Sequence, residues 1–200
     1  MFKGSHISLA KYIVNNMEVS DIEDHKKAFY FGSILPDCTP SFLVKKHRMD
    51  ETFDVLQKKI HKVTDGYNVD KGIGTVYCKN LGVITHYLAD YFTYTHNNLF
   101  QGGFKEHFKY ETRLKKTFKE YVKSDEARQI RSEERKINSI DELITFIKRE
   151  HQNYLDVIEK VKDDCQFIVR VVYRVVDAIM KFFQGRQVSA TGLLVAAYEA

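Results

Sequence analysis

Two pairs of side chains in the middle of the sequence have the residue types and the spacing that bind metal ions. His86 and Asp90 are four residues apart, as are His107 and Glu111, and His96 lies between the two pairs. Residues four apart in a helix project from the same face, so each pair presents an imidazole and a carboxylate to one point. One such pair is usually an ordinary surface ion pair. Two pairs joined by a third histidine favour a metal site.

The residues around the first pair are apolar, which matters because an uncompensated buried charge is costly. They are Leu81, Val83, Ile84, Leu88 and Phe92. A metal ion or an ion pair must therefore balance the carboxylate of Asp90. The second pair is flanked by Phe104, Phe108 and Tyr110, which predicts that it is half-buried.

Long helices are the elements that must position these side chains. The 200 residues include only ten Gly and two Pro, and 44% of them are hydrophobic, which favours an all-α multi-helix bundle in a single domain over 1–200. Hydrophobic periodicity and capping residues, among them Ser5 and Ser139, predict about seven helices. They cover 5–17, 20–33, 50–63, 74–94, 104–122, 139–162 and 165–183. The charged segment 124–138 is compatible with either a helix or a loop. Gly185 is expected to cap the last helix.

Charge and cysteine content exclude several kinds of partner and site. The 31 Lys and Arg against 27 Asp and Glu leave a net charge of +4. The basic residues alternate with acidic ones instead of forming the one-sided patch that nucleic acid requires, so no nucleic-acid partner is expected. Three cysteines without a CxxC pair predict neither a disulfide framework nor a thiolate zinc site.

Two further segments bear on where the protein acts. The first segment, 1–16, has no apolar run followed by a cleavage site, so we expect a cytoplasmic protein. The apolar segment 165–183 is long enough to span a membrane, but its charged residues fall on one stripe of a helix, which predicts a largely buried helix with one solvated edge. These residues are Arg170, Arg174, Asp177 and Lys181. No basic amphipathic helix is recognised, so no stable membrane anchor is expected.

The metal-binding motifs resemble those of a known family. The run from His86 to Glu111 follows the pattern H-x3-D-x5-H, then a loop containing Gly-Phe, then H-x3-E. It resembles the metal-binding core of the zinc-dependent phospholipase C family, which is related to single-strand nucleases. Upstream, the resemblance extends to three more positions, which are His6, Asp37 and His47. It covers about residues 5–111.

The resemblance implies up to three zinc ions in a cleft of the bundle, each held by imidazole and carboxylate, a donor set that suits zinc. The implied sets are Asp37, His47, His86 and Asp90 for the first ion, His96, His107 and Glu111 for the second, and His6, a bridging Asp90 and the chain's amino group for the third. Only five residues precede His6. We therefore expect two to three ions, the third depending on whether the amino group folds back to His6.

The resemblance also implies a zinc-dependent phosphoric diester hydrolase of the phospholipase C type. A metal-activated water would attack a phospholipid head group or a related ester, and Asp37 would take the proton from that water. Two alternatives stay open on the sequence. A nuclease or phosphatase on the same scaffold would have a base-stacking aromatic pocket beside the metals, and a zinc-binding helical protein without turnover would have closed coordination.

Several residues depart from the family's pattern or lie outside it. The choline-recognising acid of the family has no counterpart, so specificity for phosphatidylcholine is not implied. Thr93-Tyr94 replaces a common Gln-Pro, so the helix is expected to run further toward His96. Three histidines lie among charged residues and are expected to be solvated, namely His25, His61 and His151. Three tyrosines near the motifs are either core residues or part of the cleft wall, namely Tyr87, Tyr91 and Tyr94.

Overall fold

The computed structural model describes residues 1–17, 20–39, 46–129 and 136–198, and within these ranges its regular elements are all helical. The all-α prediction is confirmed. The long helices are α1 (Lys3–Asn16), α3 (Lys26–Ile34), α4 (Met49–Val63), α5 (Thr75–Tyr91), α6 (Phe104–Tyr121), α8 (Ile140–Val157) and α9 (Val161–Tyr198). Shorter ones are α2 (Ser20–Asp24) and α7 (Asp125–Gln129). The described part of the chain thus has the seven long helices that the periodicity predicted.

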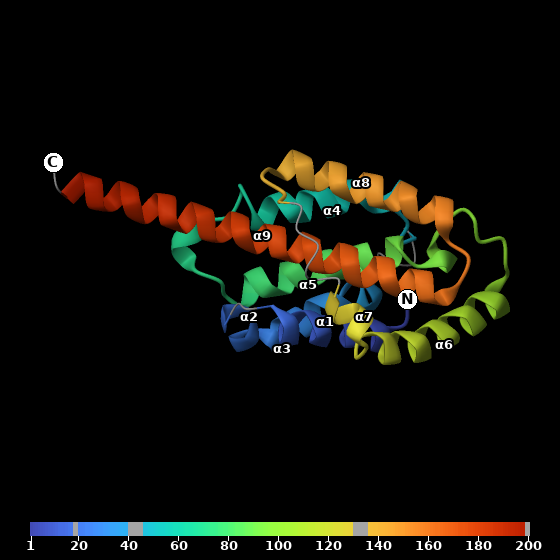
Figure 1. Cartoon of the computed structure of the whole chain (residues 1–200). Helices are drawn as coiled ribbons and strands as arrows, with labels where there is room; N and C mark the ends of the chain where they lie inside the picture. Colours follow the sequence, from blue (N-terminus) through green and yellow to red (C-terminus); the bar gives the residue numbers. More distant parts are fainter. Residues whose placement is uncertain (18–19, 40–45, 130–135, 199–200) are drawn as a thin grey trace.

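Helix α5 lies at the centre of the bundle. It packs against α1, α3, α4 and α9, and in Figure 1 α4 and α8 lie along one side of α9 while α1 and α3 lie on the other. The buried apolar residues form one contiguous cluster to which all of these long helices contribute. An α-helix buried all round is normally apolar throughout. The exceptions on α5 are therefore informative, and they include His86 and Asp90.

Several helix boundaries differ from the predictions. The predicted helix 20–33 is interrupted at His25, which separates α2 from α3, and α8 ends at Val157 instead of residue 162. Gly185 does not cap the last helix, because α9 continues through it to Tyr198 and leaves the bundle (Figure 1). The predicted cap at Ser139 is confirmed, since its hydroxyl accepts from the Glu142 N–H at 3.1 Å.

Two boundary changes affect the predicted ligands directly. Helix α1 begins at Lys3, so Ser5 is a buried residue inside the helix instead of its cap. Helix α5 ends at Tyr91, and the chain turns through Phe92 into a 3₁₀ helix, η4 (Tyr94–His96). The helix therefore ends before the predicted boundary at residue 94. The sequence did not decide between helix and loop for segment 124–138. Within it, α7 is helical, and residues 130–135 lie outside the described residues.

Among the described residues, none of the helices combines the length and the hydropathy that crossing a bilayer requires. This agrees with the prediction that segment 165–183 is a buried helix with one solvated edge. In α9, Val172, Val175 and Ile179 are fully buried, whereas the Lys181 side chain is largely exposed and pairs with Asp177 at 2.8 Å.

Helices α3 and α5 touch backbone to backbone through two glycines. A Cβ atom on Gly82 would lie closer than 3.0 Å to the carbonyl oxygen of Phe29, and one on Gly32 would clash with the carbonyl oxygen of Lys79. Protein interiors absorb such a clash only by moving backbone. The close approach brings the end of α3 and the 3₁₀ helix η1 (Pro36–Cys38) against α5. These glycines therefore determine how near Asp37 lies to His86.

We predict that Gly82→Ala destabilises the protein by ~2 kcal/mol or more, because the added methyl group must push α3 away from α5. Gly185→Ala is the matched control, since a Cβ there meets no atom within 4 Å. It should leave the stability unchanged or raise it by up to ~1 kcal/mol. Urea unfolding followed by circular dichroism measures both changes. Equal effects of the two substitutions would contradict the role assigned to the α3–α5 contact.

Candidate metal centre

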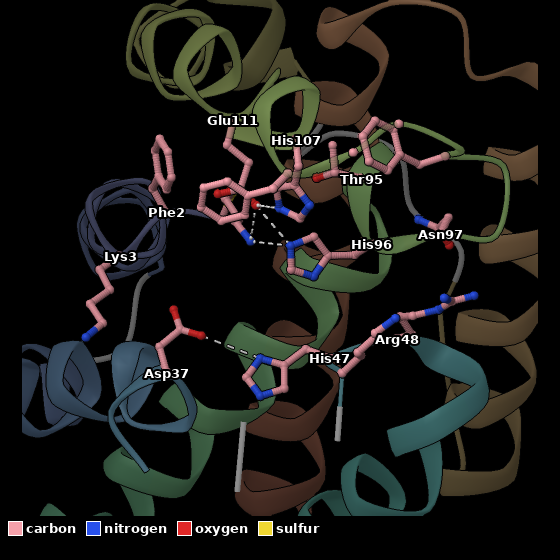
Figure 2. Close-up of a pocket in the computed structure, with 16 residues that line it drawn as sticks. Phe2, Lys3, Asp37, His47, Arg48, Thr95, His96, Asn97, His107 and Glu111 are labelled. Atoms are coloured by element: carbon pink, nitrogen blue, oxygen red, sulfur yellow. Dashed lines mark hydrogen bonds and ion pairs between the residues drawn. The ribbon is translucent and has the colours of Figure 1, made fainter. Parts of the chain in front are cut away.

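A cavity of about 880 Å³ opens at the end of α5 and is bordered by two groups of predicted ligands. Figure 2 shows Glu111, His107 and His96 on one side of it and Asp37 and His47 on the other. Two other kinds of side chain line the same cavity. The basic ones are Lys3, Lys46 and Arg48, and the aromatic ones are Phe2, Phe100 and Phe104.

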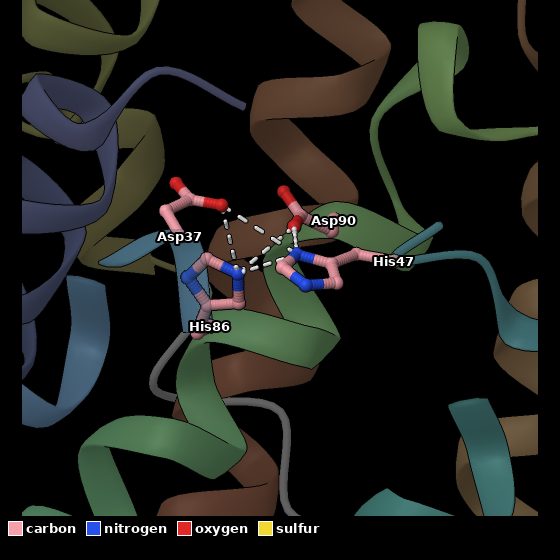
Figure 3. A group of neighbouring side chains, drawn as sticks. All are labelled: Asp37, His47, His86 and Asp90. Atoms are coloured by element: carbon pink, nitrogen blue, oxygen red, sulfur yellow. Dashed lines mark hydrogen bonds and ion pairs between the residues drawn. The ribbon is translucent and has the colours of Figure 1, made fainter. Parts of the chain in front are cut away.

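The first group of ligands contains Asp37, His47, His86 and Asp90, which turn toward one another in Figure 3. Their ligand atoms all lie within 4.8 Å of one another. His86 Nε2 is 2.9 Å from His47 Nδ1, 3.1 Å from Asp90 Oδ2 and 3.6 Å from Asp37 Oδ1. Asp37 comes from η1, His47 precedes α4, and the other two lie on α5. Three segments distant in sequence thus supply one site.

The ring of His86 is oriented by a backbone carbonyl. Its Nδ1 lies 2.9 Å from the carbonyl oxygen of Ser33, near the end of α3. A carbonyl only accepts hydrogen bonds, so Nδ1 donates, and a neutral imidazole then carries its lone pair on Nε2. That lone pair faces two carboxylates and the ring of His47. Only a cation or shared protons can stabilise so many lone pairs at one point, and the donor set suits zinc.

The second group contains His96, His107 and Glu111. Glu111 Oε1 lies 2.9 Å from His107 Nε2 and 3.0 Å from His96 Nε2. Helix α6 begins at Phe104, where Gly103 N–H donates to the Glu106 side chain at 3.1 Å. It supplies His107 and Glu111, which are four residues apart and therefore share one face of the helix. The His107 side chain is 37% exposed and that of Glu111 is 6% exposed. This group therefore faces the cavity with a side open to solvent.

The contacts of His6 and the amino group of Met1 bring together the residues implied for a third ion. The amino nitrogen lies 2.7 Å from Asp90 Oδ1 and 2.8 Å from His96 Nε2. His6 Nε2 lies 3.3 Å from Asp90 Oδ1, yet both ring nitrogens of His6 are buried without a hydrogen-bond partner among the described residues. A buried imidazole without a partner, aimed at a carboxylate, suits a bound cation. The five residues before His6 do fold back to it.

The electrostatic surroundings keep the central carboxylates ionised. Burial alone would raise the pKa of Asp90, but the amino group of Met1 and the rings of His96 and His86 outweigh it and hold that pKa well below its usual range. Burial also raises the pKa of Glu111, but the hydrogen bonds of this carboxylate with His107 and His96 outweigh burial and lower its pKa. Ionised carboxylates and imidazole lone pairs are the states that bind metal.

At two other groups of the site, burial dominates and moves the pKa toward the neutral form. Burial, reinforced by the nearby ring of His86, lowers the pKa of His6 to about 3, so this imidazole is neutral near pH 7. Burial raises the pKa of Asp37, and its neighbour Asp90 adds to the rise. Asp37 is therefore a stronger base than an ordinary aspartate.

The surface assignment of the remaining histidines is only partly right. His61 is exposed and lies 3.1 Å from Asp65, as expected of a surface pair, and His25 is half-buried. The prediction that His151 is a solvated surface residue is wrong. Burial lowers its pKa, and its Nε2 lies 2.9 Å from Asn97 Oδ1. The amide of Asn97 in turn donates to the carbonyl of Thr93 at 2.8 Å. His151 thus braces the turn that carries His96, a role that its charged sequence neighbours concealed.

None of the three tyrosines considered for the cleft wall lines this cavity. Tyr87 stands edge-on to the His47 ring with centroids 5.3 Å apart. Tyr91 is fully buried beside Thr52, with hydroxyl oxygens 3.0 Å apart. The basic and aromatic cavity residues, in contrast, were not identified from the sequence. The second pair is half-buried as expected, with His107 partly exposed and Glu111 buried, although the flanking rings of Phe104 and Phe108 are themselves exposed.

A buried carboxyl on α9, Asp164, connects the segments that carry the second group. It accepts hydrogen bonds from Tyr94 N–H at 3.1 Å, from the Tyr110 hydroxyl at 3.0 Å and from the Tyr154 hydroxyl at 2.9 Å. Tyr94 begins η4, and Tyr110 directly precedes Glu111. Asp164 is fully buried, and burial raises its pKa to about 7. No sequence motif marks this residue, because its partners come from three other elements.

Comparison with protein families agrees with the geometry of the site. A family model described as zinc dependent phospholipase C matches residues 5–160, which include all eight candidate ligands and extend beyond the segment 5–111. No curated protein and no solved structure matches the chain.

We predict that zinc stabilises the folded protein through these groups. A ligand that binds only the folded state raises the unfolding free energy, by ~2.7 kcal/mol at a hundredfold excess over its Kd. The melting temperature should therefore fall after chelation and recover with zinc but not with magnesium, which prefers oxygen ligands. His107→Ala should reduce both the recovery and the zinc content per chain. His61→Ala, which removes a similar histidine–carboxylate pair from the surface, should change neither, and equal losses in the two variants would contradict the site.

The raised pKa of Asp164 predicts that the stability of the protein depends on pH. Its pKa is raised in the folded state above the unfolded value of 3.8, so its contribution is complete below about pH 4 and is lost as the pH rises through about 7. An asparagine side chain cannot ionise, so the stability of the wild type relative to Asp164→Asn should fall over this interval, by at most ~1.4 kcal/mol per pH unit. Urea unfolding of both proteins with chelator present measures this difference. A difference that is constant with pH would show that the carboxyl titrates normally.

Proposed function

Because the chain belongs to the zinc dependent phospholipase C family, we propose that it hydrolyses phosphoric diesters and that its substrate is a phospholipid or a related ester. The observation that carries this proposal is the position of the two ligand groups, which border one cavity. A site that only stabilised the fold would be closed by protein ligands. The exposed side of His107 leaves room for a substrate and for water.

Zinc is the metal that we propose for these groups. The first ion would be held by Asp37, His47, His86 and Asp90, the second by His96, His107 and Glu111, and a third by His6 and Asp90 together with the amino group of Met1. Bound zinc would lower the pKa of a coordinated water and would polarise the phosphoryl oxygens. The buried ring of His6, whose nitrogens have no hydrogen-bond partner among the described residues, and the converging lone pairs around His86 support this assignment.

The basic side chains of the cavity suit a substrate with a phosphate group. Lys3 and Lys46 are exposed on its wall, and Arg48 lies beside His47 (Figure 2). The guanidinium of Arg48 also contacts Asp50 at 3.4 Å, which restricts its orientation. A planar guanidinium can contact two phosphate oxygens at once, and the lysines add positive charge. These residues would bind and orient the diester.

Asp37 is the residue that we assign as the general base. Its Oδ1 lies 3.6 Å from both His47 Nδ1 and His86 Nε2, whereas its other oxygen points away from His47 in Figure 2. Asp37 lines the cavity, and burial raises its pKa, so it is placed to accept a proton. Water would add to phosphorus as Asp37 takes its proton, the bond from phosphorus to the ester oxygen would break, and the leaving oxygen would take a proton from solvent, to which Asp37 releases the proton that it accepted.

One observation favours a second candidate, a nuclease on the same scaffold. Phe2, Phe100 and Phe104 line the cavity, and aromatic rings beside a phosphate site can stack on nucleobases. The Phe100 ring is already in edge-on contact with His107, with centroids 5.8 Å apart. Hydrolysis of a single-stranded oligonucleotide in preference to a lipid diester would favour this candidate.

We predict that Asp37→Asn keeps the fold but lowers turnover of p-nitrophenyl phosphorylcholine by about 100-fold or more, since asparagine cannot accept the proton. Zinc content per chain is measured on the same samples, so that a lost ligand is distinguished from a lost base. Asp54→Asn, an exposed aspartate on α4, is the control and should retain full turnover. Unchanged turnover in Asp37→Asn would refute the assignment.

A further inference from the structure

Three large apolar side chains are exposed beside the metal cavity. Phe104 is 88% exposed, Phe108 is 56% exposed and Leu99 is 48% exposed. All three come from the short segment between the candidate ligands His96 and Glu111. Single exposed apolar residues are common on protein surfaces, but a group of them next to a binding cavity marks an interaction surface.

The geometry of α6 makes this apolar surface continuous with the cavity. Phe104 and Phe108 are four residues apart and lie on one face of the helix. Phe104 lines the cavity, and so does Phe2. The rings of Phe2 and Phe108 are in edge-to-face contact, with centroids 5.3 Å apart. The apolar surface therefore extends from the cavity wall to the outside of the molecule.

Basic side chains lie next to these rings. Lys105 and Lys109 directly follow the two phenylalanines and are exposed, and Lys3 is exposed on the cavity wall. The acidic neighbour Glu106 accepts from Gly103 N–H at 3.1 Å. Lysine side chains extend their ammonium groups to the level of lipid head groups, where anionic lipids attract them. The apolar and basic side chains together match an anionic bilayer surface.

We propose that this rim, which consists of Leu99, Phe104, Phe108, Lys105 and Lys109, rests on the surface of an anionic phospholipid bilayer. The phenylalanines insert between the head groups, and the cavity then opens toward the ester bonds of the lipid. The inference rests on the proposed function for its choice of lipid as the partner. A second copy of the chain matches the rim less well, because an interface of two identical faces would oppose lysines to lysines.

Vesicle binding tests the rim without requiring turnover. The full chain with Asp37→Asn is sedimented with vesicles of phosphatidylcholine, with and without phosphatidylserine, so that binding is measured on intact lipid. Adding Phe108→Ser and Leu99→Ser should weaken binding about tenfold, because two apolar side chains no longer leave water. Phe31→Ser is the matched control, since Phe31 is 51% exposed on α3, and it should bind as before. Lys105→Glu with Lys109→Glu should weaken binding only to the anionic vesicles, and added salt should do the same.

The outcomes separate this inference from the proposed function. Absence of vesicle binding, or an equal effect of the Phe108 and Phe31 substitutions, would overturn the proposal that the rim binds the bilayer. Self-association that Phe108→Ser abolishes, without any vesicle binding, would assign the rim to a contact between copies of the chain and would also overturn it. Turnover of the soluble p-nitrophenyl phosphorylcholine by the wild type tests the hydrolase separately. Vesicle binding that depends on Phe108, in a chain without that turnover, would support the rim and refute the hydrolase.

Discussion

The ionised carboxylate of Asp90, buried within the mostly apolar helix α5, is the constraint on which the rest of the structure depends. Removing a carboxylate from water is costly unless donors and cations replace the water. Asp90 is fully buried, and its compensation comes from other parts of the chain. The amino group of Met1 lies 2.7 Å from it, and His47 and His86 each lie 3.1 Å from it. One charge on α5 therefore requires the start of the chain and the segment before α4 to converge.

A second buried carboxyl shows how the kind of partner determines the protonation state. Asp164 and Asp90 are both fully buried, yet their pKa values shift in opposite directions. Asp164 is surrounded by two tyrosine hydroxyls and one backbone N–H, which are neutral, so burial dominates. Asp90 faces the amino group of Met1 and the rings of His96 and His86, whose electrostatic effect on its pKa outweighs that of burial. Asp164 holds together the segments that carry His96 and Glu111, and Asp90 lies at the centre of the candidate metal site.

The side chains along the path from the surface to this centre change from apolar and basic to acidic and imidazole. This order suits an amphiphilic diester. The outside is apolar and basic around Phe108, the cavity wall carries Lys3 and Arg48, and the floor consists of carboxylates and imidazoles. Each zone suits one part of a phospholipid, from acyl chain to phosphate. The proposed hydrolysis and the proposed membrane surface are thus two uses of the same arrangement of α6 and α5.

The sequence by itself determined the features that depend on neighbours within one helix. The all-α fold, the ligand pairs on α5 and α6, and the cap at Ser139 follow from spacing, because helical geometry fixes which residues share a face. The Asp37–His47 pair was identified by resemblance to a family. Only the tertiary structure decided that Phe108 is exposed, that His151 is half-buried against Asn97, that α5 ends before His96 and that Asp164 joins three elements. Those features depend on which helices pack together, and contacts between residues far apart in the chain leave no periodic pattern in the sequence.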